Sequence, residues 1–247
     1  MTNAPAPVAL ITGGASGLGA AIGASLAADG TRVVFADLDL VRAGAQAAAA
    51  GGASCAIEID VCRPEDWQRV IEEVDELFGR LDYLVNAAGI APIASIAECT
   101  FEEWRRVQAV NVDGTFLGCK SALPLMEKSG GGAIVNLGSV SGLVGGHNLA
   151  AYNASKGAVR MLTKSVALHC ARQGNGVRCN SVHPAFVRTP MIDPMLESAG
   201  EHKLARQIPA GRLIEAQEVA DLVRFLVSPS AEMITGADYV IDGGLTA

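Results

Sequence analysis

The sequence predicts an α/β fold, with one doubly wound domain over residues 1–247 and helices on both faces of a parallel seven-stranded sheet. Three observations predict it. Short β-branched runs alternate about six times with longer runs rich in Ala and Leu. Several strand-like runs are apolar nearly throughout, as is typical of parallel strands covered on both faces. No internal repeat, long linker or change of composition divides the chain.

Each element has its own local signal. Strands are expected at 8–12, 31–37, 54–60, 82–88, 132–139, 176–184 and 238–242. Helices are expected at 17–29, 40–50, 64–78, 101–109, 112–128, 151–172 and 215–227. Pro64 suits the first turn of its helix, and Thr100 with Glu103 fits a capping box. Repeated strand–helix–strand units favour right-handed crossovers.

The alternation breaks once, at about 185–214, where a helix-like insert replaces a tight turn. In open α/β sheets, ligands bind outside the carboxyl ends of the strands. We therefore interpret the insert as a lid over a substrate, with a decorative surface loop as the alternative.

Composition restricts the functions. Half of the residues are apolar and 18% are charged, which allows a large core. The net charge of −7 argues against nucleic acid or an anionic membrane as partner. The six cysteines form no C-x-x-C pair, so we expect buried thiols and no metal site. With no signal-like start and no run of about 18 apolar residues, the chain is expected to be soluble and cytoplasmic.

A glycine-rich loop directly follows the first strand. The residues Thr12 to Gly19 read "TGGASGLG" and open a helix. Glycines at such a strand–turn–helix let the backbone approach a pyrophosphate that the helix N-terminus faces. The pattern predicts a Rossmann-type dinucleotide site that includes Gly13, Ser16, Gly17, Leu18 and Gly19.

Asp37 ends the second predicted strand. A carboxylate at this position accepts hydrogen bonds from the adenosine ribose hydroxyls and repels a 2′-phosphate. Neither Ala15 nor Leu38 offers a positive charge for such a phosphate, and Arg42 lies well along the next segment. The sequence therefore predicts NAD, rather than NADP, as the cofactor.

Tyr152 and Lys156 stand one helical turn apart in "YNASK". A free tyrosine titrates near 10, too high for a base at neutral pH. A cation on the same helix face is expected to lower the pKa of the phenol. Ser139, at the end of an apolar strand, supplies a hydroxyl. These three residues predict acid–base chemistry on an alcohol or a carbonyl.

The chain resembles the short-chain dehydrogenases/reductases along its whole length. The resemblance rests on motifs in the family's order: Thr12–Gly19, Asp60, Asn86–Gly89, Asn111, Ser139, Tyr152–Lys156, His183–Pro190 and Asp242–Gly244. It implies an oxidoreductase in which hydride passes directly between substrate carbon and nicotinamide.

The resemblance also implies residue roles. Tyr152 would exchange the proton with the substrate oxygen, and Ser139 would orient that oxygen. Lys156 would also hold the nicotinamide ribose, and Asn111 would hold a water linking Lys156 to solvent. Further cofactor contacts are implied for Leu38, Asp60, Val61, Asn86, Ala87, Gly89, Pro184, Val187 and Thr189.

Several residues are expected to face a small-molecule substrate. They are Ser141, His147, Leu149, Phe186 and Met191, with Leu143, Val144, Met195 and Leu196 as further apolar wall. The alternatives are an incidental loop histidine at 147 and apolar residues that only pack the lid on the core. His183 is expected to be structural.

The first interpretation is an NAD-dependent oxidoreductase of an apolar secondary alcohol or ketone, cyclic or steroidal, similar to bacterial hydroxysteroid and alicyclic alcohol dehydrogenases. One alternative is a 3-oxoacyl-carrier-protein reductase, which would prefer NADP and bind an acidic carrier. The other is a dinucleotide-binding regulator, which would be expected to lose Ser139, Tyr152 or Lys156. The family usually forms homotetramers, and Ala154, Gly157 and Ala158 would let a second helix approach closely.

Overall fold

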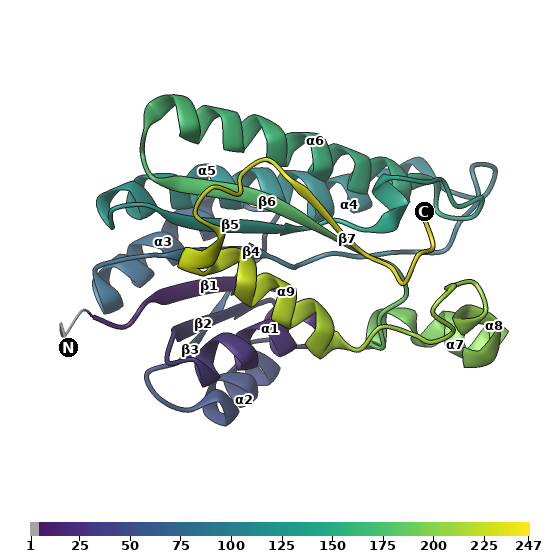
Figure 1. Cartoon of the computed structure of the whole chain (residues 1–247), viewed down its shortest axis with the longest axis horizontal. Helices are drawn as coiled ribbons and strands as arrows, with labels where there is room; N and C mark the ends of the chain where they lie inside the picture. The colour runs from purple at the N-terminus through teal and green to yellow at the C-terminus, as the bar shows by residue number, and fades with distance from the viewer. Residues whose placement is uncertain (1–4) are drawn as a thin grey trace.

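The computed structural model describes residues 5–247 and contains the predicted parallel seven-stranded sheet (Figure 1). The strand order is β3-β2-β1-β4-β5-β6-β7, and every neighbouring pair is parallel. The strands are β1 (Val8–Thr12), β2 (Arg32–Asp37), β3 (Cys55–Glu58), β4 (Tyr83–Asn86), β5 (Gly132–Leu137), β6 (Val177–Pro184) and β7 (Asp238–Ile241). Residues 1–4 of the predicted domain lie outside the described residues.

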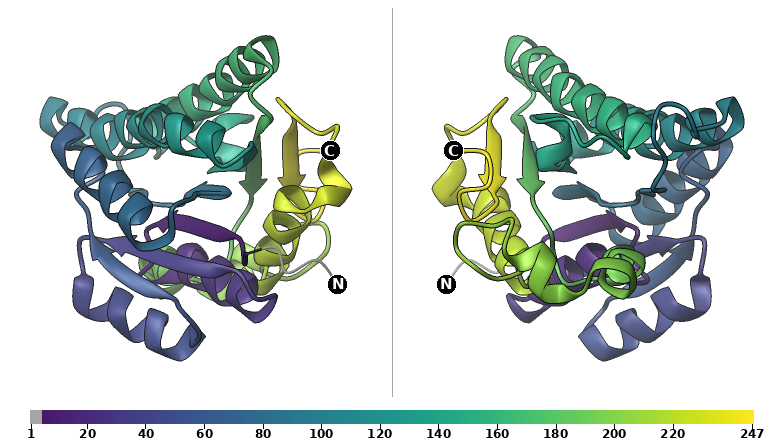
Figure 2. Two further views of the ribbon diagram at one scale, coloured as in Figure 1. Left: turned by 90° about the vertical axis from the view of Figure 1, so that its left-hand side faces the viewer. Right: turned by 90° about the vertical axis from the view of Figure 1, so that its right-hand side faces the viewer.

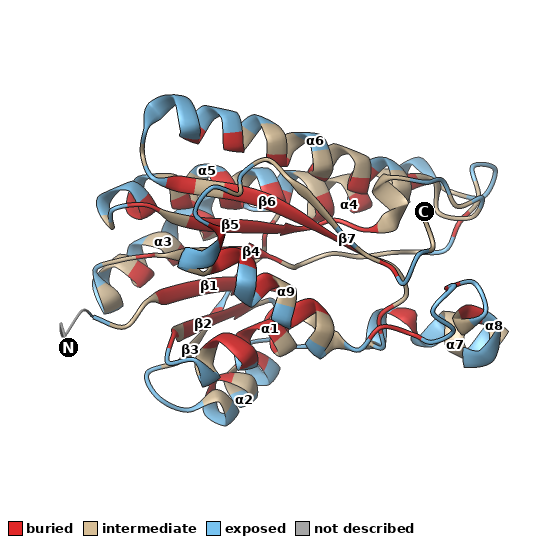
Figure 3. Cartoon of the chain, in the orientation of Figure 1, coloured by how far each residue is buried: buried red, intermediate tan, exposed pale blue. Residues whose placement is uncertain are grey.

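Helices cover both faces of the sheet, as predicted (Figure 2). One face carries α1 (Gly17–Ala28), α2 (Leu40–Ala50) and α9 (Ala216–Val227). The other carries α3 (Pro64–Phe78), α5 (Gly114–Lys128) and α6 (Ala150–Gln173). Alternate side chains of β1 serve the two cores: Leu10 packs with α3, and Ile11 packs with α1. The inner strands are consequently buried almost throughout, whereas the edge strands β3 and β7 are mostly half-buried (Figure 3).

The order of strands reverses between β1 and β4, which lie side by side at the centre of the sheet. The chain leaves β1 toward β2 on one side and leaves β4 toward β5 on the other. The two sets of crossovers therefore diverge beyond the carboxyl ends of β1 and β4. This crevice is where open α/β sheets bind ligands.

The region around Asn111 differs from the prediction. The sequence predicted two helices with Asn111 opening the second, whereas α4 (Phe101–Gln108) continues into α5 through a π-helical turn over Ala109–Asp113. A π turn holds one residue more than an α turn and is frequent at functional sites. Here it sets the side chain of Asn111 inward, where it is fully buried.

The insert folds as α7 (Asp193–Ala199) and α8 (Glu201–Ala205), beside the carboxyl end of the sheet (Figure 1). It has a small apolar core of Ile192, Leu204, Ile208 and Leu213. At its base, Arg188 donates hydrogen bonds to Glu201 and Glu215. The insert is therefore a packed unit attached to the ligand edge.

The remaining sequence expectations concern cysteines and membranes. All six cysteines are free thiols. Cys119, Cys170 and Cys179 are buried as expected, whereas Cys55, Cys62 and Cys99 are only half-buried, in or beside shorter, more exposed elements. Within residues 5–247, none of the helices combines the length and apolar character needed to span a bilayer.

Candidate active site

A cleft of about 560 Å³ opens at the carboxyl ends of β5 and β6, between the body of the domain and the insert. Ser139, Tyr152 and Lys156 line it together, as the sequence predicted. All five residues expected to face a substrate also line it: Ser141, His147, Leu149, Phe186 and Met191. Cofactor residues predicted from the sequence that reach it are Leu18, Ala87, Gly89, Pro184, Val187 and Thr189.

Ser139 lies just beyond the end of β5, before a short 3₁₀ turn. Its hydroxyl oxygen accepts a hydrogen bond from the Ser141 N–H at 3.1 Å, which keeps the oxygen aimed at the cleft. The side chain is almost buried, with 8% of Ser139 exposed. A hydroxyl fixed in this way can still donate to a substrate oxygen.

Tyr152 and Lys156 lie on the first two turns of α6, which bring both side chains to the cleft. The Lys156 ammonium lies 5.5 Å from the centre of the Tyr152 ring. It donates a hydrogen bond of 2.7 Å to the main-chain carbonyl of Leu137, at the end of β5. Helix α6 and strand β5 are thereby joined at the point where the catalytic candidates meet.

The direction of one pKa shift differs from the prediction. Burial raises the pKa of Tyr152, and its hydrogen bond with the Ser139 side chain offsets part of that rise. Burial lowers the pKa of Lys156 to about 8. The predicted lowering of the phenol pKa is wrong, because loss of water on burial is the largest influence on both groups.

Asn111 lies behind Lys156 and outside the cleft lining. Its carboxamide oxygen accepts from the Ile90 N–H at 2.9 Å, and its amide donates to the Ile90 carbonyl and the Ser155 hydroxyl, each at 3.0 Å. A Cβ added at Gly89 would lie 3.3 Å from this carboxamide oxygen and 3.7 Å from the Lys156 ammonium. Asn111 thus ties the loop after β4 to α6, and Gly89 gives that loop its close approach.

The glycine loop fits a dinucleotide pyrophosphate. Gly13 has φ +68°, and a Cβ there would come within 2.9 Å of the Ala88 nitrogen, so only glycine fits against the β4 loop. Ser16 precedes α1, and its exposed side chain makes no capping hydrogen bond. The first turn of α1 contains no acidic residue. Free donors at a helix N-terminus favour a phosphate group.

Asp37, predicted to bind the adenosine ribose, lies beside the glycine loop. Its carboxylate accepts from the N–H of Ala15 in the glycine loop and from the Asp39 N–H, each at 3.0 Å. Leu38 beside it is 66% exposed and uncharged. Asp60 is half-buried and accepts from the Cys62 N–H at 2.9 Å. The carboxylate of Asp37 is therefore fixed next to the loop that would hold the phosphates.

Two other residues that were predicted to bind the cofactor contact the protein interior. Val61 packs against Gly114, and a Cβ added at Gly114 would come 2.9 Å from a methyl group of Val61. The amide of Asn86 donates 2.8 Å to Asn136 inside the core, and its carboxamide oxygen has no hydrogen-bond partner in the described chain. The backbone at Ala87 follows, tied by its N–H to Thr12 at 3.1 Å. Asn86 therefore positions the loop without presenting its side chain to the crevice.

Further lining residues were not identified from the sequence. The insert contributes Ser198, Ala199, Lys203 and Gln207, and the C-terminal segment contributes Leu245. Their positions depend on how the insert folds back, for which the sequence has no periodic signal. Leu143 and Leu196, expected in the apolar wall, do not line the cleft, and Leu196 packs within the insert.

Comparisons with known proteins show which family the chain belongs to. The family model described as enoyl-(acyl carrier protein) reductase matches residues 13–246. The chain is 41% identical over 249 residues to a trans-4-hydroxycyclohexanecarboxylate dehydrogenase of Sinomonas cyclohexanicum, with 97% of this chain and 93% of the relative covered. It is 38% identical over 244 residues to an NADP-dependent (R)-specific alcohol dehydrogenase of Lentilactobacillus kefiri, with 97% and 96% covered.

A solved structure extends the likeness to three dimensions. The 3-ketoacyl-(acyl-carrier-protein) reductase from Brucella melitensis, complexed with NADH, superposes with a TM-score of 0.92 at 33% identity and covers 98% of each chain. The match therefore includes the sheet, both helical layers and the insert. The chain belongs to the short-chain dehydrogenase/reductase family.

Proposed function

We propose that the protein is an NAD-dependent oxidoreductase that transfers hydride between a secondary alcohol or ketone and nicotinamide. The observation that carries the proposal is that Ser139, Tyr152 and Lys156 meet at one end of a mostly apolar cleft. The crevice at β1 and β4 supports a dinucleotide, since its glycine loop and the free Ser16 hydroxyl fit phosphates. A bound nicotinamide supplies or accepts the hydride.

The chain's own residues handle the substrate oxygen and its proton. Ser139 donates a hydrogen bond that orients and polarises the carbonyl oxygen. Tyr152, protonated at neutral pH because burial raises its pKa, gives its proton to that oxygen in reduction. Oxidation needs the phenolate, so its rate should rise with pH. Lys156 stabilises the phenolate by its charge, and its remaining N–H donors can hold ribose hydroxyls.

Asn111 supports this arrangement through the Ile90 loop and Ser155 rather than by touching the substrate. The proposed water between Lys156 and solvent would lie on the side of Lys156 that faces Asn111 and Gly89. That water remains a prediction. The proposal is supported by the closeness of both side chains to Gly89, where an added Cβ would lie 3.3 Å from the Asn111 carboxamide oxygen and 3.7 Å from the Lys156 ammonium.

The preference for NAD rests on Asp37. Its carboxylate is held beside the glycine loop, and the neighbouring Leu38 provides no positive charge. Arg42, the nearest candidate cation along the chain, pairs with Asp39 at 3.4 Å. A 2′-phosphate bound at this place would lie next to the Asp37 carboxylate, which would repel it. The relative from Lentilactobacillus kefiri is described as NADP-dependent, so coenzyme preference has to be measured on this chain.

The substrate is proposed to be apolar and cyclic, up to steroid size. Phe186, Met191 and Met195 form much of the wall, and methionine adapts to bulky shapes. Among the described lining residues none is Asp or Glu, although the chain carries a net charge of −7. The exposed Lys203 lies at the insert side. These features favour neutral or anionic alcohols over amines, in agreement with the hydroxycyclohexanecarboxylate relative.

The second candidate is a 3-oxoacyl-carrier-protein reductase. It is favoured by the superposed reductase structure, and the matching family's description names an acyl carrier protein as well, although for an enoyl reductase. It is disfavoured by Asp37, because such reductases are expected to prefer NADP. A regulator without turnover is disfavoured further, since Ser139, Tyr152 and Lys156 are all present and gathered in the cleft.

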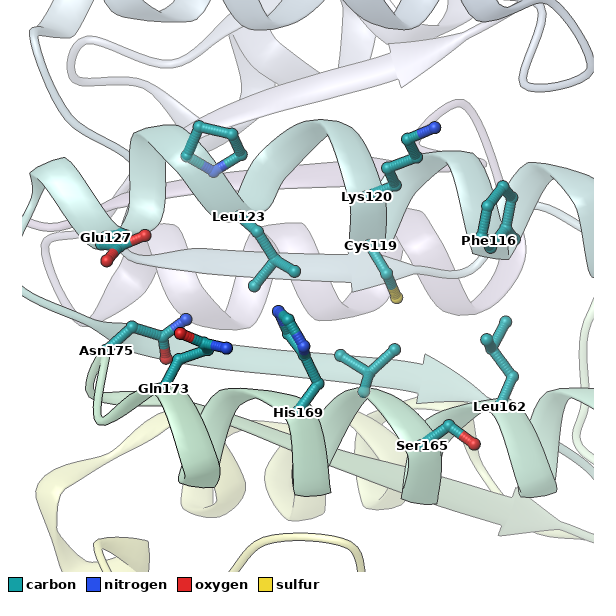
Figure 4. Close-up of a pocket in the computed structure, with 12 residues that line it drawn as sticks. Phe116, Cys119, Lys120, Leu123, Glu127, Leu162, Ser165, His169, Gln173 and Asn175 are labelled. Carbon is teal, nitrogen blue, oxygen red and sulfur yellow. The ribbon is translucent and has the colours of Figure 1, made fainter.

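A homotetramer is proposed, assembled through α5 and α6. A groove of about 630 Å³ runs between these helices, lined by apolar residues such as Phe116, Leu123 and Leu162 (Figure 4). Met161 and Leu168 on α6 are 59% and 62% exposed. A Cβ built at Gly157 meets nothing within 4 Å, so this glycine is not explained by packing inside one chain. A second copy of the chain would cover these surfaces, and light scattering of wild type and Leu168→Glu tests it.

A cytoplasmic location also remains a prediction, supported by six cysteines that are all free thiols. It can be tested by fractionating cells and following NADH formation.

The proposed function is tested by incubating the protein with NAD⁺ or NADP⁺ and a panel of alcohols, while following absorbance of the reduced coenzyme. The panel contains short-chain, cyclic, carboxylated cyclic and steroid alcohols and 3-hydroxyacyl thioesters. Turnover with NAD⁺ and a cyclic alcohol, abolished in Tyr152→Phe, supports the proposal. Turnover of thioesters with NADP⁺ alone would favour the acyl-carrier reductase, and coenzyme binding without any turnover would favour the regulator.

A further inference from the structure

A histidine that no catalytic role explains is buried directly behind Ser139. His183 lies near the end of β6 and is fully buried. Its Nδ1 lies 3.0 Å from the main-chain oxygen of Ser139. Its Nε2 lies 2.8 Å from the hydroxyl of Ser181 on the same strand. The ring therefore bridges β6 to the segment that carries the catalytic hydroxyl.

The chemistry of these partners fixes the histidine tautomer. A main-chain carbonyl only accepts hydrogen bonds, so Nδ1 must carry a proton and donate it to Ser139. Burial lowers the pKa of His183, while the Ser139 carbonyl and Asp238 act to raise it, and Arg160 and Lys156 act to lower it. Nε2 is then an acceptor at neutral pH, and it competes with the Asp238 carboxylate for the single proton of the Ser181 hydroxyl.

Behind Ser181 the ring is anchored to a charged cluster. The Ser181 hydroxyl lies 3.0 Å from one carboxylate oxygen of Asp238 on β7. The other oxygen accepts from Arg160 at 2.7 Å and from Lys164 at 2.9 Å, both on α6. The same helix carries Tyr152 and Lys156. A series of hydrogen bonds and ion pairs therefore connects the Ser139 carbonyl through His183, Ser181 and Asp238 to α6, the helix that holds the other two catalytic candidates.

The backbone before Ser139 is shaped to receive the ring. A Cβ at Gly138 would come 2.5 Å from the Cε1 and Nδ1 atoms of His183. The Gly138 N–H donates 2.8 Å to the Val182 carbonyl, and the Leu137 carbonyl accepts from Lys156 at 2.7 Å. The Ser139 carbonyl accepts a main-chain hydrogen bond from the Gly142 N–H at 2.9 Å and a side-chain hydrogen bond from His183. His183 therefore ties the residue that bears the catalytic hydroxyl to β6.

We propose that His183 is a positioning residue for hydride transfer, holding Ser139 through its main-chain carbonyl so that the Ser139 hydroxyl meets the substrate oxygen. This inference rests on the proposed function. The Nδ1–H donates to the carbonyl whether or not Nε2 is protonated, so the tether does not depend on pH. Protonation of Nε2 would change only the link to Ser181, which would then accept from Nε2 and donate to Asp238.

The test compares steady-state kinetics of His183→Phe and His183→Asn with wild type. Phenylalanine keeps a flat ring without an N–H, whereas the asparagine amide restores a donor near the place of Nδ1. Thr163→Val is the matched control, because it removes another buried hydrogen bond between α6 and β5, the 2.9 Å bond from Asn136, without touching Ser139. Thermal unfolding of each variant shows how much stability the substitution removes.

Loss of the tether is expected to lower kcat roughly tenfold in His183→Phe, since misplacement of a group near the chemistry by a fraction of an ångström has effects of this order. The KM for NAD⁺ and the shape of the pH profile should stay unchanged, and His183→Asn should recover most of kcat. In a Ser139→Ala background, His183→Phe should change kcat less than about twofold, because the two residues act through one contact.

Several outcomes would overturn the inference alone. These are an unchanged kcat in His183→Phe, an equal loss in Thr163→Val, or an undiminished effect in the Ser139→Ala background. A changed pH profile would instead assign His183 to proton transfer. If His183→Phe does not fold, His183→Gln, whose amide donor reaches the place of Nε2 rather than that of Nδ1, must lower kcat or the inference fails. Wild-type protein that oxidises no alcohol would overturn the proposed function, and this inference with it.

Discussion

Lys156 should make the protein less stable at neutral pH while serving catalysis. Its ammonium is almost fully buried, with 6% of the residue exposed, and receives one main-chain partner, the Leu137 carbonyl. Burial lowers its pKa from the ordinary 10.5 to about 8. The difference corresponds to about 3 kcal/mol of unfolding free energy at neutral pH, at 1.36 kcal/mol per pKa unit. Lys156→Met, which keeps the length of the chain without the charge, should recover part of it.

The sign follows from proton uptake. Because the pKa is lower in the folded protein, the unfolded chain holds a proton between pH 8 and 10.5 that the folded chain lacks. Unfolding free energy therefore rises with pH across this window. Below pH 8, burial of the charged Lys156 lowers the unfolding free energy by its full amount, and above pH 8 this loss becomes smaller. Between pH 6.5 and 9.5, wild type should gain about 2 kcal/mol relative to Lys156→Met.

Urea unfolding of both proteins at four pH values from 6.5 to 9.5 measures this difference. Lys128→Met, which removes a lysine whose side chain is 60% exposed, is the control for loss of a positive charge. Lys156→Met should also lose most of its turnover, since the proposed role of Lys156 requires the charge. A stability difference between wild type and Lys156→Met that stays constant over the whole pH range would refute the reasoning.

Three further predictions concern the coenzyme, the insert and the core. Asp37→Ser should raise the KM for NAD⁺ roughly ten- to hundredfold, as loss of charged hydrogen bonds does, and an Asp39→Ser control should not, in parallel NAD⁺ titrations. Arg188→Leu should raise the KM for the alcohol by freeing the insert from Glu201, while the urea midpoint stays nearly unchanged because the pair is exposed; an unchanged KM would count against a lid. Gly118→Ala should destabilise the fold by about 1–3 kcal/mol in urea, since its Cβ would come 2.7 Å from the Trp67 ring; equal stability would show that the helix can shift.

The central elements were predictable because one physical signal specified each of them. Strand β1, apolar and followed directly by glycines, was expected at 8–12 and is found at Val8–Thr12. Pro64 opens α3 as predicted, since a proline at the first helical position costs no hydrogen bond. The meeting of Ser139 with Tyr152 and Lys156 was predicted from the family's motif order, and the cleft brings all three together.

The features that the sequence did not predict share one cause, because each depends on contacts between distant segments. The direction of the Asn86 side chain is set by Asn136 on the neighbouring strand. The position of Lys203 in the wall of the cleft depends on how the insert packs on its own core. The raised pKa of Tyr152 comes from burial, which spacing along a helix does not report. Local patterns predict elements, whereas side-chain direction and desolvation are decided by tertiary packing.

Asn111 was predicted from the sequence, whereas its contacts were not, and these contacts allow a last prediction. The sequence selected the residue, but its π turn and its three hydrogen bonds to Ile90 and Ser155 follow only from the fold. Asn111→Leu should lower the unfolding free energy by about 2–4 kcal/mol, because it leaves the N–H and carbonyl of the half-buried Ile90 without their hydrogen-bond partner. Ser155→Ala removes one of the three bonds and should cost about 1 kcal/mol.

The same substitutions separate structure from catalysis. If Asn111 acts by holding the Ile90 loop against Lys156, Asn111→Leu should lose turnover far beyond what Ser155→Ala loses, at a temperature where both variants are folded. Crystals of Asn111→Leu should then show the loop after β4 displaced from α6. A variant that keeps the parent's turnover with its stability reduced would show that Asn111 serves only the fold, and that Lys156 needs no support from the π turn.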